Sequence, residues 1–213
     1  FKMKKLIIAI TSAFMLLANS AMSMDLRPAV GISGNYGVYA ATGIENNYNE
    51  AGSAIDTTTK EYGAFDASFG SVFVELGLTD AISFGVDYVP ETIETPTNTS
   101  NDGGVNTNNV YAEFEDLTTL YLKINVPLGG TYIKVGHSTV DVLSRESMSS
   151  GNSYGNDQSD GLTAGIGYAH EMMSGLSIRA ELTGTEFSSV STTNGQTNKT
   201  EIKVEDMIGA RGT

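Results

Sequence analysis

The sequence predicts an all-β fold: an eight-stranded antiparallel up-and-down transmembrane β-barrel whose last strand is truncated. Three observations predict it. From Leu26 to Val38, apolar and polar residues alternate with the period of two that marks a β-strand with unlike faces. Similar segments recur along the chain, and the connections between them are alternately long and short. The polar faces carry mostly Gly, Ser, Thr and Asn, which suit a narrow barrel lumen.

The first 23 residues have the composition of a secretory signal peptide. A lysine-rich start precedes an apolar run from Leu6 to Leu17, and the small residues Ala21-Met22-Ser23 form a cleavage site. The alternative, a membrane-anchoring helix, would need about 20 apolar residues. We therefore expect a cleaved signal peptide at residues 1–23, followed by a barrel domain at residues 24–213.

Composition excludes several classes of protein. The chain has a formal net charge of −13, and three of its lysines lie in the leader, so the barrel domain is still more acidic. This charge argues against binding to nucleic acid and against docking on anionic headgroups through a basic patch. There is no cysteine, so an exported domain of this size must be held by a core or by lipid.

Eight strands are expected in chain order, joined by connections of two lengths. The strands cover residues 25–39, 61–76, 81–89, 110–126, 131–142, 162–168, 176–183 and from 201 onward. Long polar loops are expected at 41–60, 91–109, 144–160 and 188–200, and tight turns at 77–80, 127–130 and 172–175. Because each hairpin pairs neighbouring strands, an up-and-down order follows.

Most of these strands have two clearly different faces. The third strand places Ile82, Phe84, Val86 and Tyr88 opposite Ser83, Gly85 and Asp87. The fourth places Ala112, Phe114, Leu120, Leu122, Ile124 and Val126 opposite Glu113, Glu115, Thr119, Tyr121, Lys123 and Asn125. The sixth places Leu162, Ala164, Ile166 and Tyr168 opposite Thr163, Gly165 and Gly167. The seventh places Leu176, Ile178, Ala180 and Leu182 opposite Ser177, Arg179, Glu181 and Thr183.

Two strands have no single predicted register. In the second, one face would hold Phe65, Phe69 and Phe73, and the other Val72, Val74 and Leu76. A β-bulge near Ser71 would reconcile these two sets. In the fifth, Ile133, Val135 and His137 favour one face, and then Val140 and Val142 favour the other.

The polar face decides whether the apolar face meets a core or lipid. A soluble barrel has an apolar interior and a wet exterior, whereas a membrane barrel has an apolar outer band and a polar interior. Here the polar face is rich in small residues and carries isolated charges of both signs. Short turns at one end and long acidic loops at the other are typical of outer-membrane barrels. We therefore place the apolar face in lipid.

The isolated charges on or near the polar faces predict an ion-pair network that plugs the lumen. An unpaired charge in a narrow interior would lose several kcal/mol of solvation, so the charges should pair. The candidate residues are Arg27, Asp87, Glu113, Glu115, Lys123, Lys134, Glu171, Arg179, Glu181 and Arg211. Among them we expect Arg179 and Lys123 to be the central cations.

This combination of leader, eight alternating strands, long outer loops and short turns resembles the small Gram-negative outer-membrane barrels of the OmpA-transmembrane and opacity-protein type, within the porin superfamily. The resemblance implies a protein of the cell outer membrane. Such barrels usually end on a strand that closes with a C-terminal aromatic residue. This chain ends on EIKVEDMIGARGT, partway through an alternating run, so we expect that the last few residues of the final strand are missing.

The sequence offers little for catalysis, cofactors or metals. Glycine-containing stretches such as GISGNYG lack the helix start or Gly-Lys-Ser/Thr end of a phosphate-binding loop. His137 and His170 lie in different strands, without the local spacing of a metal site. Outer-membrane lipid A deacylases use a His-x-Ser pair on one strand face, but here Ser138 directly follows His137 and points to the other face. We expect no catalytic, cofactor-binding or metal-binding residues.

Three hypotheses for function therefore stand. The first is a monomeric structural or surface-interaction protein with a plugged lumen, whose partners are outer-membrane lipid and lipopolysaccharide. Divalent cations could bridge its acidic loops at Asp102, Asp157 and Asp160. The second is a small channel, either polar or, as in the OmpW-like group, hydrophobic. The third is a lipid A-modifying enzyme. Eight strands leave an interior just wide enough for side chains to fill it, which favours the first hypothesis.

Overall fold

The computed structural model describes residues 26–213, apart from 103–105, 148–152, 174 and 196–199. The predicted signal peptide, residues 1–23, lies outside the described residues. In the part of the chain that is described, no helix is long and apolar enough to cross a membrane.

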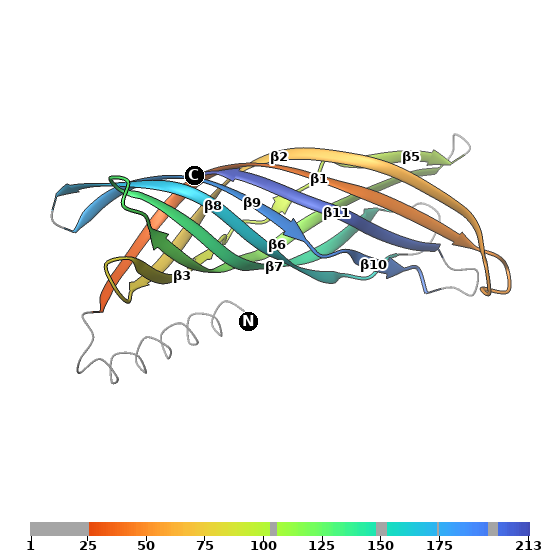
Figure 1. Ribbon diagram of the computed structural model, residues 1–213. Coiled ribbons are helices and arrows are strands. Elements are labelled where there is room, and N and C mark those ends of the chain that lie inside the picture. Colours follow the sequence, from red (N-terminus) through yellow and green to blue (C-terminus); the bar gives the residue numbers. More distant parts are fainter. Residues whose placement is uncertain (1–25, 103–105, 148–152, 174, 196–199) are drawn as a thin grey trace.

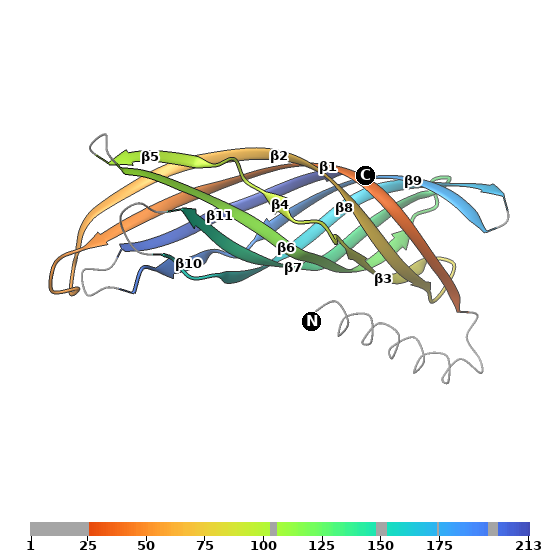
Figure 2. The same ribbon diagram turned by 180° about the vertical axis from the view of Figure 1, so that it is seen from behind.

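The described chain forms one antiparallel sheet that closes into a barrel (Figures 1 and 2). Its strands are β1 (Arg27–Tyr48), β2 (Ile55–Gly77), β3 (Ile82–Tyr88), β4 (Ile93–Glu94), β5 (Asn98–Asp102), β6 (Asn106–Asn125), β7 (Thr131–Ser147), β8 (Asp157–Met173), β9 (Leu176–Phe187), β10 (Val190–Thr193) and β11 (Thr200–Gly212).

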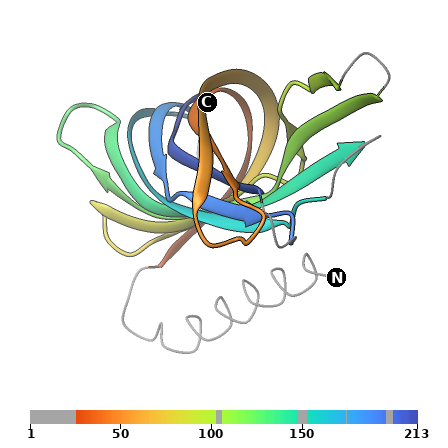
Figure 3. The same cartoon turned by 90° about the vertical axis from the view of Figure 1, so that its right-hand side faces the viewer.

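Eight of these strands make the wall of the barrel. The order is β1-β2-β3-β6-β7-β8-β9-β11, and the pairing of β11 with β1 closes the ring, which is visible end-on in Figure 3. The short strands β4 and β5 pair with β6 beyond β3, and β10 pairs with β11. The predicted eight-stranded antiparallel up-and-down barrel is confirmed. β11 ends at Gly212, opposite Tyr36 of β1.

The prediction of a long polar loop at residues 41–60 is wrong. β1 and β2 continue through most of it and form a hairpin that turns at Asn49, whose side-chain Oδ1 accepts a hydrogen bond from the Ser53 backbone N–H. The stretch is polar but carries β-branched threonines, and cross-strand bonds such as Thr58 Oγ1 to Asn46 Oδ1, at 2.8 Å, join its strands. The loops expected at 91–109 and 188–200 also contain strand, namely β4, β5 and β10.

The two strands with unassigned registers are both regular. β2 keeps its pairing with β1 without a shift from Arg27 to Asn47, so no bulge occurs near Ser71. Phe65, Phe69 and Phe73 lie on its inward face, and Val72 on its outward face. In β7, Ile133 and Val135 point outward while Val140 points inward. Both faces of these strands are apolar in part, and alternation alone could not separate them.

Two other strands change face at bulges that the sequence analysis did not predict. β6 shifts register against β7 between Glu115 and Thr118, where Asp116 adopts a φ of 55°. β11 shifts against β1 near Asp206, which adopts a φ of 51°. Each bulge adds one residue to one strand and so turns the side chains beyond it over to the other face. As a result, Ala112 and Phe114 line the interior, and their predicted outward position is wrong.

The outward face forms an apolar belt around the half of the barrel that carries the tight turns. Large apolar side chains are exposed all along this belt, whereas they are usually buried in a soluble protein. Ile32, for example, is 85% exposed. The belt includes Val30, Ile32, Val72, Phe84, Leu120, Leu122, Ile133, Val135, Leu162, Ile166, Ile178, Leu182 and Ile208. β1 and β2 have 22 and 23 residues, more than the about 9–11 that a spanning strand needs, so the first hairpin rises beyond the belt.

Inward glycines make room for aromatic rings that lie flat against the barrel wall. A Cβ atom at Gly85 would come 2.4 Å from Cζ of Tyr121, and one at Gly167 would come 2.2 Å from Cζ of Tyr132. Gly31 accommodates Phe73 in the same way. These close approaches let large rings fill a narrow interior without pushing the strands apart.

We expect Gly85→Ala to lower the free energy of unfolding by about 1–3 kcal/mol, because the added methyl group overpacks the interior against Tyr121. Tyr121 cannot easily turn away, since its hydroxyl donates to Glu75. The measurement is urea unfolding of the barrel folded in lipid vesicles. Gly34→Ala is the matched control, because nothing lies within 4 Å of a Cβ atom at that position. An equal effect of both substitutions would contradict this account of the glycines.

Candidate functional site: a lumen in two tiers

The lower tier of the lumen, within the apolar belt, is organised around Glu75 on β2. This carboxylate is 3% exposed and accepts hydrogen bonds from two cations. Nζ of Lys123 contacts its Oε1, and the Arg179 guanidinium binds both carboxylate oxygens, at 2.8 and 3.1 Å. The Tyr121 hydroxyl adds a fourth bond at 3.2 Å. Because β9, which carries Arg179, is not a neighbour of β2 in the sheet, this contact crosses the lumen.

A second ion pair lies beside the first. Lys134 on β7 donates to Glu181 on β9 at 2.9 Å, and the Tyr132 hydroxyl donates to the same carboxylate at 3.0 Å. Nζ of Lys134 also lies 4.1 Å from the centroid of the Tyr121 ring. This cation–π contact joins the second pair to the first, because Tyr121 itself binds Glu75.

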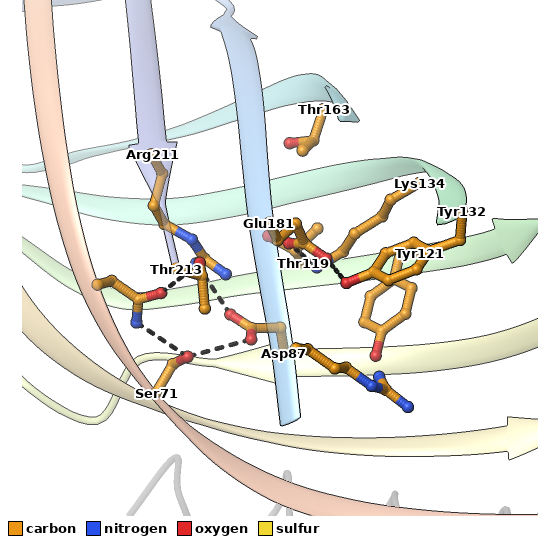
Figure 4. A network of polar contacts seen from close by, with 12 residues as sticks. Ser71, Asp87, Thr119, Tyr121, Tyr132, Lys134, Thr163, Glu181, Arg211 and Thr213 are labelled. Carbon is orange, nitrogen blue, oxygen red and sulfur yellow. Dashed lines mark hydrogen bonds and ion pairs between the residues drawn. The ribbon is translucent and has the colours of Figure 1, made fainter. Parts of the chain in front are cut away.

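A third ion pair links β11 to β3 (Figure 4). Arg211 on β11 donates to Asp87 on β3 at 3.0 Å, and the Ser71 hydroxyl donates to the other oxygen of Asp87 at 3.1 Å. Ser71 in turn accepts from the side-chain amide of Asn35, and Asn35 accepts from the Thr213 hydroxyl. This chain of hydrogen bonds links β11, β1, β2 and β3, which are consecutive strands of the wall around the closure of the barrel.

Hydroxyl groups fill the remaining space of this tier. Thr119, Ser138, Thr163 and Thr185, one from each of four consecutive wall strands, form a ladder with oxygen–oxygen distances of 2.8, 2.6 and 2.8 Å. The cavity beside the ladder has a volume of about 20 Å³, room for about one water molecule. We call the three ion pairs and this hydroxyl ladder the polar plug.

Six of the ten predicted lumen residues meet in the polar plug. They are Asp87, Lys123, Lys134, Arg179, Glu181 and Arg211. Two others lie elsewhere near the tight-turn end. Arg27 pairs with Asp80 of the β2–β3 turn at 2.8 Å, where both side chains are exposed to solvent. Glu171 is exposed near the end of β8.

Glu113 and Glu115 do not face the lumen, and their predicted place in the network is wrong. The β6 bulge turns this part of the strand over, so Phe114 points inward and the two carboxylates point outward. There they contact Arg145 of β7, which donates to Glu113 and lies 3.9 Å from Glu115.

Glu75, the central anion of the polar plug, is not among the predicted lumen residues. Glu75 lies in β2, the strand whose register could not be assigned, so its face was unknown. Glu75 is separated from Phe65 and Phe73 by even numbers of residues. Uninterrupted alternation along β2 therefore places Glu75 on the same inward face as these aromatic residues. The aromatic residues of the same face support the network, because Arg179 lies over the Phe73 ring at 4.9 Å and Arg211 over the Phe69 ring at 6.0 Å.

The upper tier is a chamber of different character, with a volume of about 390 Å³. Its walls are almost entirely apolar and include side chains from both bulged and regular strands, namely Tyr39, Phe65, Ile93, Ala112, Phe114, Leu117, Val140, Val142, Phe187, Val190, Val204 and Met207. Tyr39, Phe65 and Phe114 stack in a row, with centroid distances of 5.1 and 5.9 Å. We call this space the apolar chamber.

Residues considered for catalysis and metal binding lie apart. His137 is about half exposed on the outward face, 3.9 Å from Asp160, while Ser138 is 1% exposed and belongs to the polar plug. Oδ2 of Asp157 accepts from the Ser191 backbone N–H. The Asp102 side chain lies outside the described residues. Within the described part of the chain, no three His, Cys, Asp or Glu side chains are grouped to hold a metal ion.

Comparisons with known proteins give low similarity. No protein-family model matches the chain, and no curated protein matches it. Among solved structures, the chain is similar to Neisserial surface protein A (NspA), at 13% identity and a TM-score of 0.28, covering 85% of this chain and 97% of that one. It is also similar to Ail, the attachment invasion locus protein of Yersinia pestis, at 8% identity and a TM-score of 0.29, covering 84% and 97%.

We expect Glu75→Ala to destabilise the barrel by about 3–5 kcal/mol, because it leaves Lys123 and Arg179 buried without their carboxylate. Arg179→Ala should cost less, since Lys123 remains to neutralise Glu75. Asp80→Ala is the control, because it removes an acid whose ion pair with Arg27 is exposed and should cost little. Urea unfolding in lipid vesicles measures all three. A loss for Glu75→Ala no larger than for Asp80→Ala would mean that water already solvates the plug.

Proposed function

We propose that the protein is a monomeric integral barrel of the Gram-negative outer membrane, with a structural or surface-interaction role and a lumen closed to solutes. The observation that carries this proposal is the polar plug inside an apolar belt. Charged and hydroxyl side chains face inward at the level where large aliphatic side chains face outward. This is the polarity expected of a membrane barrel and the reverse of a soluble one.

The closed lumen is supported by how completely the plug fills the lower tier. Three carboxylates and four cations pair across the interior, and the neighbouring cavity has room for only about one water molecule. A hydrated ion would have to displace these partners to pass. The proposal therefore favours a closed barrel over a polar channel.

A role at the outer surface is supported by the part of the barrel beyond the belt. The β1–β2 hairpin continues as hydrogen-bonded sheet to its tip and carries polar side chains such as Thr58 and Asn46. A hairpin of this kind presents an ordered polar surface beyond the belt. In the proposed location, the lipopolysaccharide that surrounds the barrel is its partner. A non-catalytic role is supported by His137 and Ser138, whose side chains point to opposite faces of β7.

We expect the purified protein to show no steady ion conductance in planar lipid bilayers. The triple variant Glu75→Ala/Lys123→Ala/Arg179→Ala should conduct, because it removes the central ion-pair cluster that crosses the lumen between β2, β6 and β9. The matched control is Arg27→Ala/Asp80→Ala, which removes an ion pair at the rim and should stay closed. Steady single-channel currents from the unmodified protein would overturn the closed lumen and favour a channel.

The membrane location is tested by placing a charge on the belt. We expect Leu122→Arg to cost about 2–4 kcal/mol if this position lies near the bilayer midplane, because the guanidinium would face hydrocarbon. Thr57→Arg should be tolerated, since Thr57 is exposed on β2 beyond the belt. Unfolding in lipid vesicles measures both, and equal tolerance of the two substitutions would argue against the belt as the lipid-facing surface.

A further inference from the structure

The wall of the barrel has a seam beside the apolar chamber. β2 pairs with β3 only as far as Val72, opposite Tyr88. Beyond that point β4 and β5 pair with β6, and within the described residues no strand ladder joins them to β2. Figure 2 shows β4 lying between β2 and β6. A hydrogen bond crosses the start of the seam: the Gly70 backbone N–H donates to the side-chain carboxylate of Glu91 at 3.1 Å.

Both sides of this seam line the apolar chamber. On the β2 side the lining includes Gly63, Ala64 and Phe65, and on the other side Ile93, Thr95 and Pro96. The chamber therefore extends to the place where the wall lacks backbone hydrogen bonds. The seam begins directly above Val72 and Tyr88, near the edge of the apolar belt, so it opens at the boundary between hydrocarbon and the outer surface.

The polar groups of the chamber are already engaged. The Ser159 hydroxyl donates to the Ser188 carbonyl oxygen at 2.7 Å, and the Thr95 hydroxyl accepts from the Ala112 N–H at 2.9 Å. The hydroxyl end of Tyr39 is turned towards Gly37, on the side of the polar plug. The surface left to a ligand is thus hydrocarbon and aromatic ring. A dry cavity of this kind binds apolar matter and not water.

From these features we infer that the apolar chamber is a binding site for a single hydrocarbon chain of a membrane lipid, which enters sideways through the seam between β2 and β4. The volume of about 390 Å³ lies within the usual range for ligand pockets, about 300–1,000 Å³. The polar plug closes the chamber from below, so a chain could enter and leave without crossing the barrel. This inference rests on the proposed membrane location.

Charge around the seam favours a lipid over a free fatty acid. Asp66 on β2, and Glu91 and Glu94 on the opposite side, are exposed carboxyl groups near the opening. They would repel the carboxylate of a fatty acid held at the mouth, because like charges at short range are unfavourable. A lipid can place its chain in the chamber while its headgroup stays in the surrounding membrane.

The test uses the absence of tryptophan from the sequence. A single tryptophan is introduced by Phe114→Trp, inside the chamber, and the protein is folded in vesicles of phosphatidylcholine with brominated acyl chains, which quench nearby tryptophan. Phe73→Trp, which points inward beneath the chamber and lies against Arg179 of the polar plug, measures quenching through the wall. Leu162→Trp, which is outward and 73% exposed on the belt, measures contact with lipid.

In brominated vesicles, we expect Phe114→Trp to lose more fluorescence than Phe73→Trp. Adding Ala112→Leu to Phe114→Trp should reduce this loss to the level of Phe73→Trp, because the larger side chain takes up space in the chamber. If Leu162→Trp is quenched but Phe114→Trp only matches Phe73→Trp, the chamber holds no lipid chain and the inference fails alone. If Leu162→Trp is not quenched, both the membrane location and the inference fail.

In a second arm of the experiment, brominated fatty acid is added to unbrominated vesicles. Quenching of Phe114→Trp in that arm alone would overturn the assignment to a membrane lipid.

Discussion

The structure depends on one buried carboxylate, Glu75, and the two cations that bind it. Burying any of these charges alone would be costly, and only their contact across the lumen makes the polar interior stable. The contact also fixes the position of Tyr121, and through it Lys134 and Glu181. Because β2, β6 and β9 each contribute a partner, the network sets the width of the barrel at this level.

The two tiers of the lumen follow from where the strands keep or change their faces. β2 and β7 alternate without interruption, and their inward residues change from polar in the plug to apolar in the chamber, as from Ser138 to Val140. β6 and β11 instead use bulges, at Asp116 and Asp206, to bring apolar side chains inward above the plug. Regular and bulged strands therefore both supply apolar side chains at the same level, and β2, β6, β7 and β11 all contribute to the wall of the chamber.

Alternation along the sequence was enough to predict the barrel, its strand order and most inward charges, because lipid and lumen impose opposite polarities on successive residues. It could not place Glu75 or Val140, whose strands have apolar residues on both faces. It also could not place Glu113 or Phe114, because a bulge that depends on a positive φ at Asp116 leaves no periodic signal. The chamber was not predicted because its lining combines three kinds of position. Ala112 and Phe114 had been assigned to the lipid face, Ile93 and Val190 lay in expected loops, and Phe65 and Val140 had no assigned face.

The bulges also suggest how the interior of such a barrel can change during evolution. In a regular strand, exchanging a polar for an apolar lining requires a substitution at every inward position. At Asp116 the same exchange results from a change in strand length of a single residue, which turns over every side chain from Phe114 to the outer end of β6. Insertion or deletion of a single residue at these points is therefore a direct genetic route between a barrel that is polar throughout and one that encloses an apolar space.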